Sequence, residues 1–128
     1  MRYILLDTSF LVSCAEFKID FFSELKRICN FNFEIAILDK VLEEIDKIIN
    51  RGKKEGKMAR LAKTILLTKR ITILPTTGRK SVDKILLEKA GDKYIVATQD
   101  AGLKRLLKKK KQPVIMIRQK KHLALVKA

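Results

Sequence analysis

The chain has 128 residues and a formal net charge of +15, from 29 Lys and Arg against 14 Asp and Glu. This length suits a single domain with one hydrophobic core. Cys14 and Cys29 lack CxxC spacing, which excludes a disulfide framework or a cysteine zinc site and predicts buried free thiols. No apolar run approaches the roughly 20 residues needed to span a bilayer, and the amino terminus has no signal-peptide layout. We therefore expect a cytoplasmic protein with no membrane partner.

The positive charge is unevenly distributed along the chain. Residues 101–128 contain ten Lys or Arg and no acid, and residues 47–70 contain nine against the single acid Glu55. A surplus of this size makes a polyanion the expected partner. Nucleic acid is favoured over a merely lysine-rich, solvated surface. Because most acids lie outside these two segments, a separate acidic spot is expected as well.

Short apolar runs alternate with helix-like segments. Strands are expected at 3–6, 33–38, 71–74, 94–97 and 114–117, and helices at 10–17, 21–29, 41–51, 58–70, 82–90 and 100–109. Asp39 is expected to cap a helix, residues 53–57 to form a basic link, and HLALV at 122–126 to be a candidate edge strand.

Uniformly apolar strands separated by helices predict an α/β fold. We expect a three-layer α/β/α arrangement around a central, mostly parallel five-stranded sheet with right-handed crossovers. Residues 1–128 are expected to form one domain, with a basic C-terminal tail at about 108–128.

Two of the expected strands end in a carboxylate. Asp7 ends the segment YILLD and is followed by Thr8 and Ser9, and Asp100 ends YIVATQD. Ligands of open α/β sheets bind just beyond the carboxyl ends of the strands, so both acids would lie at the same edge. Each acid also precedes a helix, and capping explains either one equally well when it is taken alone.

Acids on two expected helices add to this pattern. Asp83 falls within the apolar arc of its helix, where a bare carboxylate would be costly to bury and would need a partner or a metal. On helix 41–51, Glu43 points away from the apolar face and is expected in solvent. Glu44 and Asp46 lie on the two flanks of that face, and helical geometry does not choose between them.

Asp7, Asp83, Asp100 and one of the two flanking acids could therefore meet at one end of a parallel sheet. Two such charges about 4 Å apart repel by on the order of 4 kcal/mol at an effective dielectric constant near 20. A divalent cation relieves this repulsion, and all-oxygen ligation suits Mg²⁺ or Mn²⁺. A metal in a carboxylate cup beside a basic surface is the design of a metal-dependent nuclease.

Over essentially its whole length the chain resembles the PIN-domain nucleases, through ILLDTSFL, VLEEI, SVDKILLEKA and YIVATQDAGLKRLL. The family's helical Glu followed by Leu or Ile matches Glu44-Ile45, which selects Glu44 over Asp46 and Glu43. Its other motifs are a strand-ending Asp followed by Thr or Ser, an Asp at the start of a later helix, and Thr/Ser-x-Asp, and they match Asp7-Thr8-Ser9, Asp83 and Thr98-Gln99-Asp100.

This resemblance implies a parallel α/β fold, Mg²⁺- or Mn²⁺-dependent endoribonuclease activity and frequent dimers. The segment VATQDAGLKRLLKKKKQPVIMIRQKKH is similar to the branch linked to small-subunit ribosomal RNA processing, which implies a ribosomal RNA precursor and a ribosome-assembly partner. VapC-type toxins, each paired with an antitoxin, are the alternative branch. The chain departs from the family where Val82 replaces the first of two adjacent acids and where Gln99 replaces a common Asn.

Three sets of residues follow from these arguments. The catalytic and metal-binding set is Asp7, Glu44, Asp83 and Asp100. The supporting set, which steadies the site or contacts phosphate, is Thr8, Ser9 and Thr98. The RNA-binding set, with a contribution expected from 53–57, is Lys104, Arg105, Lys108, Lys109, Lys110, Lys111, Arg118, Lys120 and Lys121.

Other functions fit the sequence less well. A haloacid-dehalogenase-like phosphatase needs a second Asp two residues after the first, and Ser9 stands there. A signal-receiver domain shares the architecture but has no need of such a basic tail. A catalytically silent RNA-binding module is the main non-enzyme alternative, against which the four retained carboxylates argue.

Overall fold

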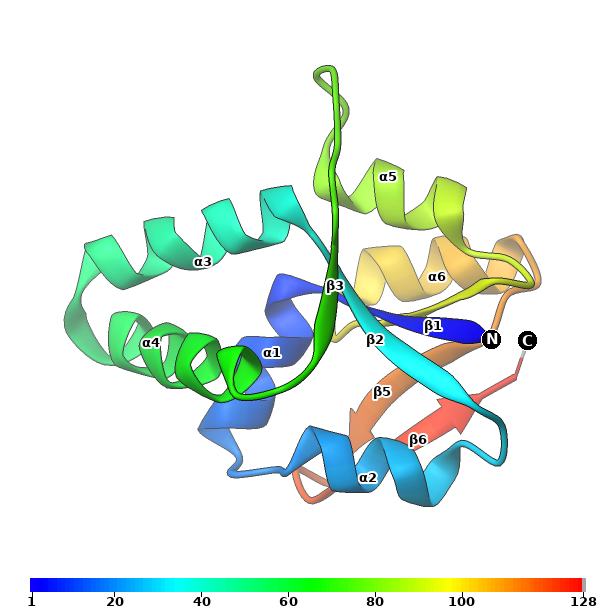
Figure 1. The fold of residues 1–128 in the computed structure, drawn as a ribbon, viewed down its shortest axis with the longest axis horizontal. Helices are drawn as coiled ribbons and strands as arrows, with labels where there is room; N and C mark the ends of the chain where they lie inside the picture. The colour runs from blue at the N-terminus through cyan, green and yellow to red at the C-terminus, as the bar shows by residue number, and fades with distance from the viewer. Residues whose placement is uncertain (128) are drawn as a thin grey trace.

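The computed structural model describes residues 1–127, which form a twisted sheet flanked by helices (Figure 1). The strands in this part of the chain are β1 (Arg2–Leu6), β2 (Phe33–Leu38), β3 (Ile71–Leu74), β4 (Tyr94–Ala97), β5 (Val114–Arg118) and β6 (His122–Val126). The helices are α1 (Thr8–Glu16), α2 (Phe21–Ile28), α3 (Asp39–Arg51), α4 (Lys53–Leu67), α5 (Val82–Lys89) and α6 (Ala101–Lys109). None of these helices is long and apolar enough to cross a membrane.

The sheet has the strand order β3-β2-β1-β4-β5-β6. All neighbouring strands are parallel except β5 and β6, which form an antiparallel pair. The chain first builds the sheet outward from β1 to β3 and then returns to place β4 on the other side of β1. The carboxyl ends of β1 and β4 therefore flank a topological switch point, where open α/β sheets hold their ligands.

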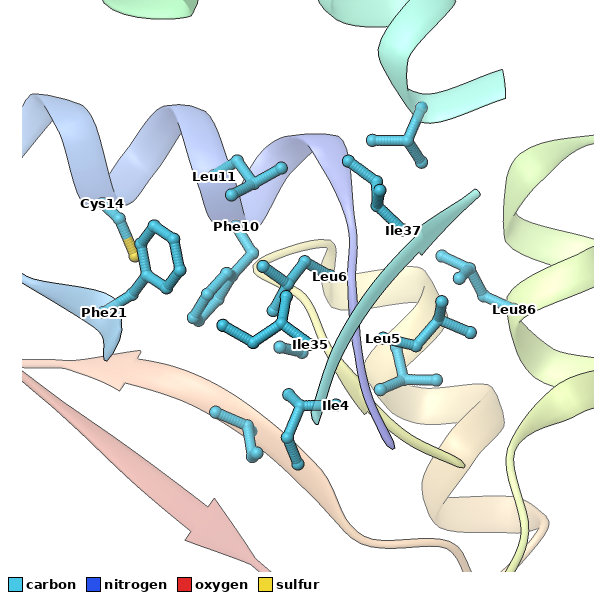
Figure 2. Close-up of a cluster of buried hydrophobic side chains, with 14 of the residues drawn as sticks. Ile4, Leu5, Leu6, Phe10, Leu11, Cys14, Phe21, Ile35, Ile37 and Leu86 are labelled. Atoms are coloured by element: carbon cyan, nitrogen blue, oxygen red, sulfur yellow. The ribbon is translucent and has the colours of Figure 1, made fainter. Parts of the chain in front are cut away.

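The apolar strands form the core, as their composition predicts. Ile4, Leu5 and Leu6 are fully buried because helices cover both faces of the central strand. Figure 2 shows Leu5 turned toward Leu86 of α5, whereas Leu6 faces Phe10 of α1 on the opposite side. The two faces of β1 are therefore covered by different helices, in the expected three-layer arrangement.

The sheet has six strands rather than the five expected from the sequence. The additional strand is β6, which pairs with β5 in the register Ile117↔Leu123 and Val114↔Val126. Gln119 and Lys120 adopt left-handed backbone conformations in the turn between them. Most of the segment expected to be a basic tail therefore forms a β-hairpin at the edge of the sheet, because two apolar runs, 114–117 and 123–126, are joined by a short polar turn and pair with each other.

Two local expectations on the α3–α4 segment were wrong. Residues 53–57 are the first turn of α4 rather than a link, because Gly52 alone, with a φ of 70°, turns the chain between the helices. Asp39 does not cap α3 but lies within its first turn. Its carboxylate instead accepts hydrogen bonds from the backbone N–H and the hydroxyl of Thr76.

The first turn of α3 holds the loop that leads into α5. Lys40 Nζ donates to the carbonyl oxygens of Gly78 and Lys80, at 3.1 and 2.9 Å, next to the Asp39–Thr76 contact. Ser81 then caps α5 by accepting from the Lys84 N–H. Because Asp83 follows two residues later, these contacts set the position of the third predicted acid.

The cysteines confirm the prediction of buried free thiols. Cys14 and Cys29 are both buried and unpaired within residues 1–127. Burial raises the pKa of the Cys14 thiol to about 12, so the unreactive thiol form dominates at neutral pH.

Candidate active site

Asp7 lies at the bottom of the site, where β1 ends and α1 begins. Only 4% of the residue is exposed, yet its carboxylate accepts three hydrogen bonds. The Thr8 N–H binds Oδ1 at 2.8 Å, while the hydroxyls of Thr98 and Ser9 bind Oδ2 at 2.7 and 3.0 Å. These donors offset the cost of removing the carboxylate from water and hold it in one orientation. Asp7 is thus both the N-cap of α1 and a buried acid facing the switch point.

Three hydroxyl groups link the elements around Asp7. Thr8 Oγ1 donates to Glu44 Oε1 at 2.5 Å, which connects α1 to α3. Thr98, fully buried after β4, donates to Asp7 and accepts from the Asp100 N–H at 3.1 Å. Ser9 Oγ accepts from the Gln99 N–H at 3.2 Å. Thr8, Ser9 and Thr98 therefore form one network with Asp7, Glu44 and the backbone N–H of Asp100.

The structure separates Glu43, Glu44 and Asp46, the three candidate acids of α3. Glu43 and Asp46 are exposed, and Asp46 pairs with Lys63 of α4 at 2.6 Å. Glu44 is half-buried and lines the same cleft as Asp7. Glu44 is therefore the acid of this helix that meets the others.

Asp83 and Asp100 stand at the rim of the cleft, and both residues are exposed. The expectation that Asp83 is buried on the apolar face of α5 was wrong, because Val82, Ile85 and Leu86 fill the core side of that helix. Asp100 caps α6, with Oδ1 accepting from the Leu103 N–H at 2.7 Å. Capping and membership of the acidic cluster are thus compatible roles for Asp100.

The acids are close enough to influence one another. The pKa of Asp83 is raised above its ordinary value, first by partial desolvation at the cleft wall and then by the negative charges of Asp7, Asp100 and Glu44. Because much of the Asp83 residue is in contact with water, solvent limits the size of this effect. Acids from the end of β1, from α3, from α5 and from the start of α6 thus line one cleft.

The acids line a cleft of about 500 Å³ that also contains two cations. Lys47 and Arg51 extend from α3 into its wall, and within residues 1–127 neither forms a side-chain hydrogen bond or ion pair. The sequence analysis did not select them. The available signal was helical spacing, because positions three and seven residues after Glu44 share its face of the helix.

The donor set of this cleft suits a hard divalent cation partly surrounded by water. Within residues 1–127, no three His, Cys, Asp or Glu side chains are placed to hold one ion together. Mg²⁺ keeps several of its waters and needs only one or two direct carboxylates. Four carboxylates around an open cleft, one of them rigidly held, fit that form of binding.

The predicted RNA-binding cations fall into separate groups. Lys104, Arg105, Lys108 and Lys109 follow the exposed side of α6. Lys110 Nζ instead binds the carbonyl oxygens of Leu87, Glu88 and Ala90, so it closes the C-terminal end of α5. Lys110 was predicted to contact RNA, but its ammonium group already donates to three carbonyl oxygens and therefore has a structural role.

The remaining predicted cations lie at turns outside the acidic cleft. Lys111 follows α6 with a left-handed backbone, and Arg118, Lys120 and Lys121 surround the β5–β6 turn. The Lys120 ammonium lies 5.7 Å from the centre of the Phe17 ring. All four residues are exposed, but none of them lines the cleft that holds the acids.

Comparison with known protein families matches nearly the whole chain to one family. The family described as "PIN like domain" matches residues 4–120 of this chain. The chain belongs to the PIN-domain nuclease family. Ribonuclease VapC4 of Methanocaldococcus jannaschii is 34% identical over 125 residues, covering 95% of each chain.

Two solved structures are similar to this fold. The PIN domain endonuclease Utp24 superposes with a TM-score of 0.81 at 25% identity, over 98% of this chain and 92% of that one. VapBC2 from Rickettsia felis, solved with a promoter DNA fragment, gives a TM-score of 0.52 at 16% identity, over 81% and 92% of the two chains. The latter likeness concerns the fold alone.

The structure explains the two departures from the PIN-domain pattern. Val82 is buried with only 8% exposed, so an acid there would point into the core, whereas Asp83 borders the cleft. Gln99 Oε1 accepts the Ile117 N–H at 2.7 Å and continues the bonding of β5 beyond the end of β4. Gln99 therefore has a contact of its own that ties the Thr98–Asp100 segment to the sheet.

Proposed function

We propose that this PIN-domain protein is a divalent-metal-dependent endoribonuclease that hydrolyses RNA phosphodiester bonds. The observation that carries the proposal is the convergence of Asp7, Glu44, Asp83 and Asp100 on one cleft at the switch point of the sheet. The similarity to Ribonuclease VapC4 and to the endonuclease Utp24 supports the same reaction class.

The four carboxylates would hold Mg²⁺ or Mn²⁺ directly or through its water shell. When bound, such a cation neutralises charge on the scissile phosphate and makes a water molecule a better nucleophile for in-line attack. Asp7 would provide the most rigid of the four ligands, because three hydrogen bonds fix its carboxylate.

The cations beside the acids would bind the RNA backbone. Lys47 and Arg51 lie in the cleft wall on the α3 side, and Arg105 and Lys109 follow the acids on the α6 side. Phosphates on both sides of the scissile bond would thereby be neutralised. Thr8, Ser9 and Thr98 would act by holding the carboxylates, since their hydroxyls already bind one another and the acids.

Cleavage of labelled structured RNA in the presence of Mn²⁺ tests the proposal. We expect the wild-type protein to cut the RNA and Asp7→Asn to lose nearly all activity, because Asn removes the charge but keeps the shape. Equal cleavage by both proteins would contradict the assignment. RNA binding without cleavage by either protein would favour the silent RNA-binding module.

Two biological roles share this chemistry. Ribosomal RNA processing is supported by the resemblance of residues 96–122 to the branch of the family linked to that process. A VapC-type toxin, held by an antitoxin partner, is supported equally by the 34% identity to Ribonuclease VapC4. A small antitoxin gene beside this one, together with growth arrest on expression of the wild type but not of Asp7→Asn, would favour the toxin.

A further inference from the structure

A second pocket of about 280 Å³ lies on the face of the sheet beside α6. Its floor is apolar. Val114 and Met116 are two residues apart on β5 and so point to the same face, and the register Val114↔Val126 places Val126 next to them. Val114 is buried, with 6% exposed, whereas Met116 and Val126 are half-buried and form the accessible part of the floor.

The rim of this pocket is basic. Lys104 and Lys108 extend from α6, and Lys127 follows β6 on the opposite side. No acidic residue lines the pocket, and within residues 1–127 none of these three lysines forms a side-chain hydrogen bond or ion pair. The side-chain amide of Gln112 also borders the pocket without a hydrogen-bond partner in this part of the chain. The pocket thus combines an apolar floor, unpaired cations and one free amide.

Shared lining residues relate this pocket to the acidic cleft through a third hollow. Arg105 borders both the pocket and a neighbouring hollow of about 510 Å³, which extends past Lys109 to Asp83 and Asp100. Those two acids also line the acidic cleft. Lys108 follows Asp100 by eight residues, which is about 12 Å along the helix axis. That length corresponds to about three or four stacked nucleotides at roughly 3.4 Å each.

We propose that this pocket, formed by α6, β5 and β6, binds one unpaired nucleobase of the RNA strand whose scissile phosphate lies in the acidic cleft. The inference rests on the proposed nuclease function, to which it adds a single-stranded segment beside the cut site. The apolar floor receives one face of the base, and the Arg105 guanidinium stacks on the base or its neighbour.

The rim residues complete this recognition. Lys104, Lys108 and Lys127 bind the phosphates on either side of the base. The Gln112 amide, which offers both a donor and an acceptor, meets the base edge. A paired base could not enter the pocket, so the substrate is single-stranded at this position.

An abasic scan tests the pocket directly. A labelled single-stranded RNA of twelve nucleotides is bound by the wild-type protein in EDTA, with one abasic site moved along the strand. We expect about a tenfold loss of affinity at one position and little change at the others, because burying one base contributes that much. Met116→Glu removes the apolar floor, so the RNA affinity of this variant should not depend on the position of the abasic site.

Charge variants make the test independent of the folding of Met116→Glu. Replacing Lys108 and Lys127 by Gln should weaken RNA binding and reduce the slope of log affinity against log salt by about 1.4, since each phosphate contact contributes roughly 0.7. Replacing Arg60 and Arg70 by Gln, which removes the same charge from exposed positions outside the predicted RNA-binding set, should leave the position-dependent loss unchanged.

The outcomes distinguish this inference from the proposed function. A flat scan of the wild type, absence of measurable RNA binding, or equal competition by polyglutamate would overturn the nucleobase pocket, the last in favour of an acidic peptide. Cleavage with Mn²⁺ together with a flat scan would overturn the pocket and leave the nuclease intact. A position-dependent scan without cleavage would support the pocket and count against the nuclease.

Discussion

At the scale of single residues, the site depends on hydroxyl groups as much as on carboxylates. Asp7 is held by Ser9 and Thr98, and Glu44 by Thr8. Thr8 and Thr98 each reach a carboxylate of a distant segment, and Ser9 holds the carboxylate at the N-terminus of its own helix. The carboxylates are therefore oriented before any ligand arrives, which is a property of the chain rather than of the metal.

Thr98→Val tests this orientation. Valine keeps the shape of the buried side chain but cannot donate to Asp7 or accept from the Asp100 N–H. We expect the cleavage rate to fall by about 10- to 100-fold and the free energy of unfolding to fall by about 1–3 kcal/mol. Thr64→Val, which removes an exposed hydroxyl bonded to the Arg60 carbonyl, should change neither quantity appreciably. Full activity of Thr98→Val would contradict a positioning role.

The two cations of the cleft give a second prediction at this scale. Lys47→Gln and Arg51→Gln should each weaken RNA binding several-fold and reduce its salt dependence by a slope of about 0.7, because each removes one phosphate contact. Stability should not change, since neither side chain bonds within residues 1–127. Arg60→Gln, at an exposed position of α4, serves as the control. An unchanged salt slope for both cleft variants would exclude these phosphate contacts.

At the scale of elements, α2 closes the free edge of β6. Glu24 Oε1 accepts the Leu123 N–H at 2.9 Å, while Arg27 donates to the Leu123 carbonyl oxygen at 3.0 Å and to Glu24. An exposed strand edge invites pairing with another chain. The ion pair on α2 occupies this part of the edge, which protects the hairpin that also forms the floor of the proposed nucleobase pocket.

This contact predicts a pH dependence of stability. The hydrogen bonds from Arg27 and from the Leu123 N–H lower the pKa of Glu24 to about 2, against about 4.3 in an unfolded chain. A depressed pKa stabilises the fold above pH 4.3, and this stabilisation is lost as the pH falls toward 2. Glu24→Gln should therefore be less stable at pH 6 by about 1 kcal/mol and should lose less stability between pH 4.3 and 2.

Urea unfolding from pH 2 to 6 measures the effect. Glu16→Gln, at an exposed position that forms no side-chain hydrogen bond within residues 1–127, is the matched control and should follow the wild type. A Glu24→Gln curve parallel to the wild type throughout would show that the Glu24 contacts do not contribute to stability.

The close pairing of α3 and α4 gives a prediction about glycine. A Cβ atom at Gly56 would lie 3.0 Å from the Ile49 carbonyl oxygen and 3.2 Å from that of Ile48. Gly56→Ala should therefore destabilise the protein by about 1–3 kcal/mol, because backbone atoms cannot move aside as a flexible side chain can. Gly91→Ala, whose Cβ would meet only the Lys89 carbonyl oxygen at 3.8 Å, should be tolerated. Equal thermal midpoints for the two variants would contradict the close approach.

At the scale of the whole molecule, a net charge of +15 surrounds an acidic site. The excess Lys and Arg side chains repel one another in the folded state, and salt screens that repulsion. We therefore expect the thermal midpoint to rise between 50 and 300 mM NaCl while RNA affinity falls steeply over the same range. A thermal midpoint that falls with salt would indicate that attractive ion pairs dominate instead.

The sequence alone determined the parallel α/β core and most of the acidic site. Uniform apolar runs such as Ile4–Leu6 can be buried only when both faces of a strand are covered, so local composition already specifies the layers. Asp7 and Asp100 were found because each ends such a run, and strand ends of a parallel sheet meet at one edge. These features depend on residues that are close together in the chain, and they can therefore be predicted from the sequence.

Only the tertiary structure decided how the surrounding side chains are used. Helical geometry left Glu44 and Asp46 equivalent, whereas the position of α4 pairs Asp46 with Lys63 and leaves Glu44 to the cleft. The tertiary structure also places Asp83 at the rim of the cleft and brings the Lys110 ammonium group to the C-terminal end of α5. These outcomes depend on contacts between elements that are distant in sequence. The periodicity of residues along one helix does not predict such contacts.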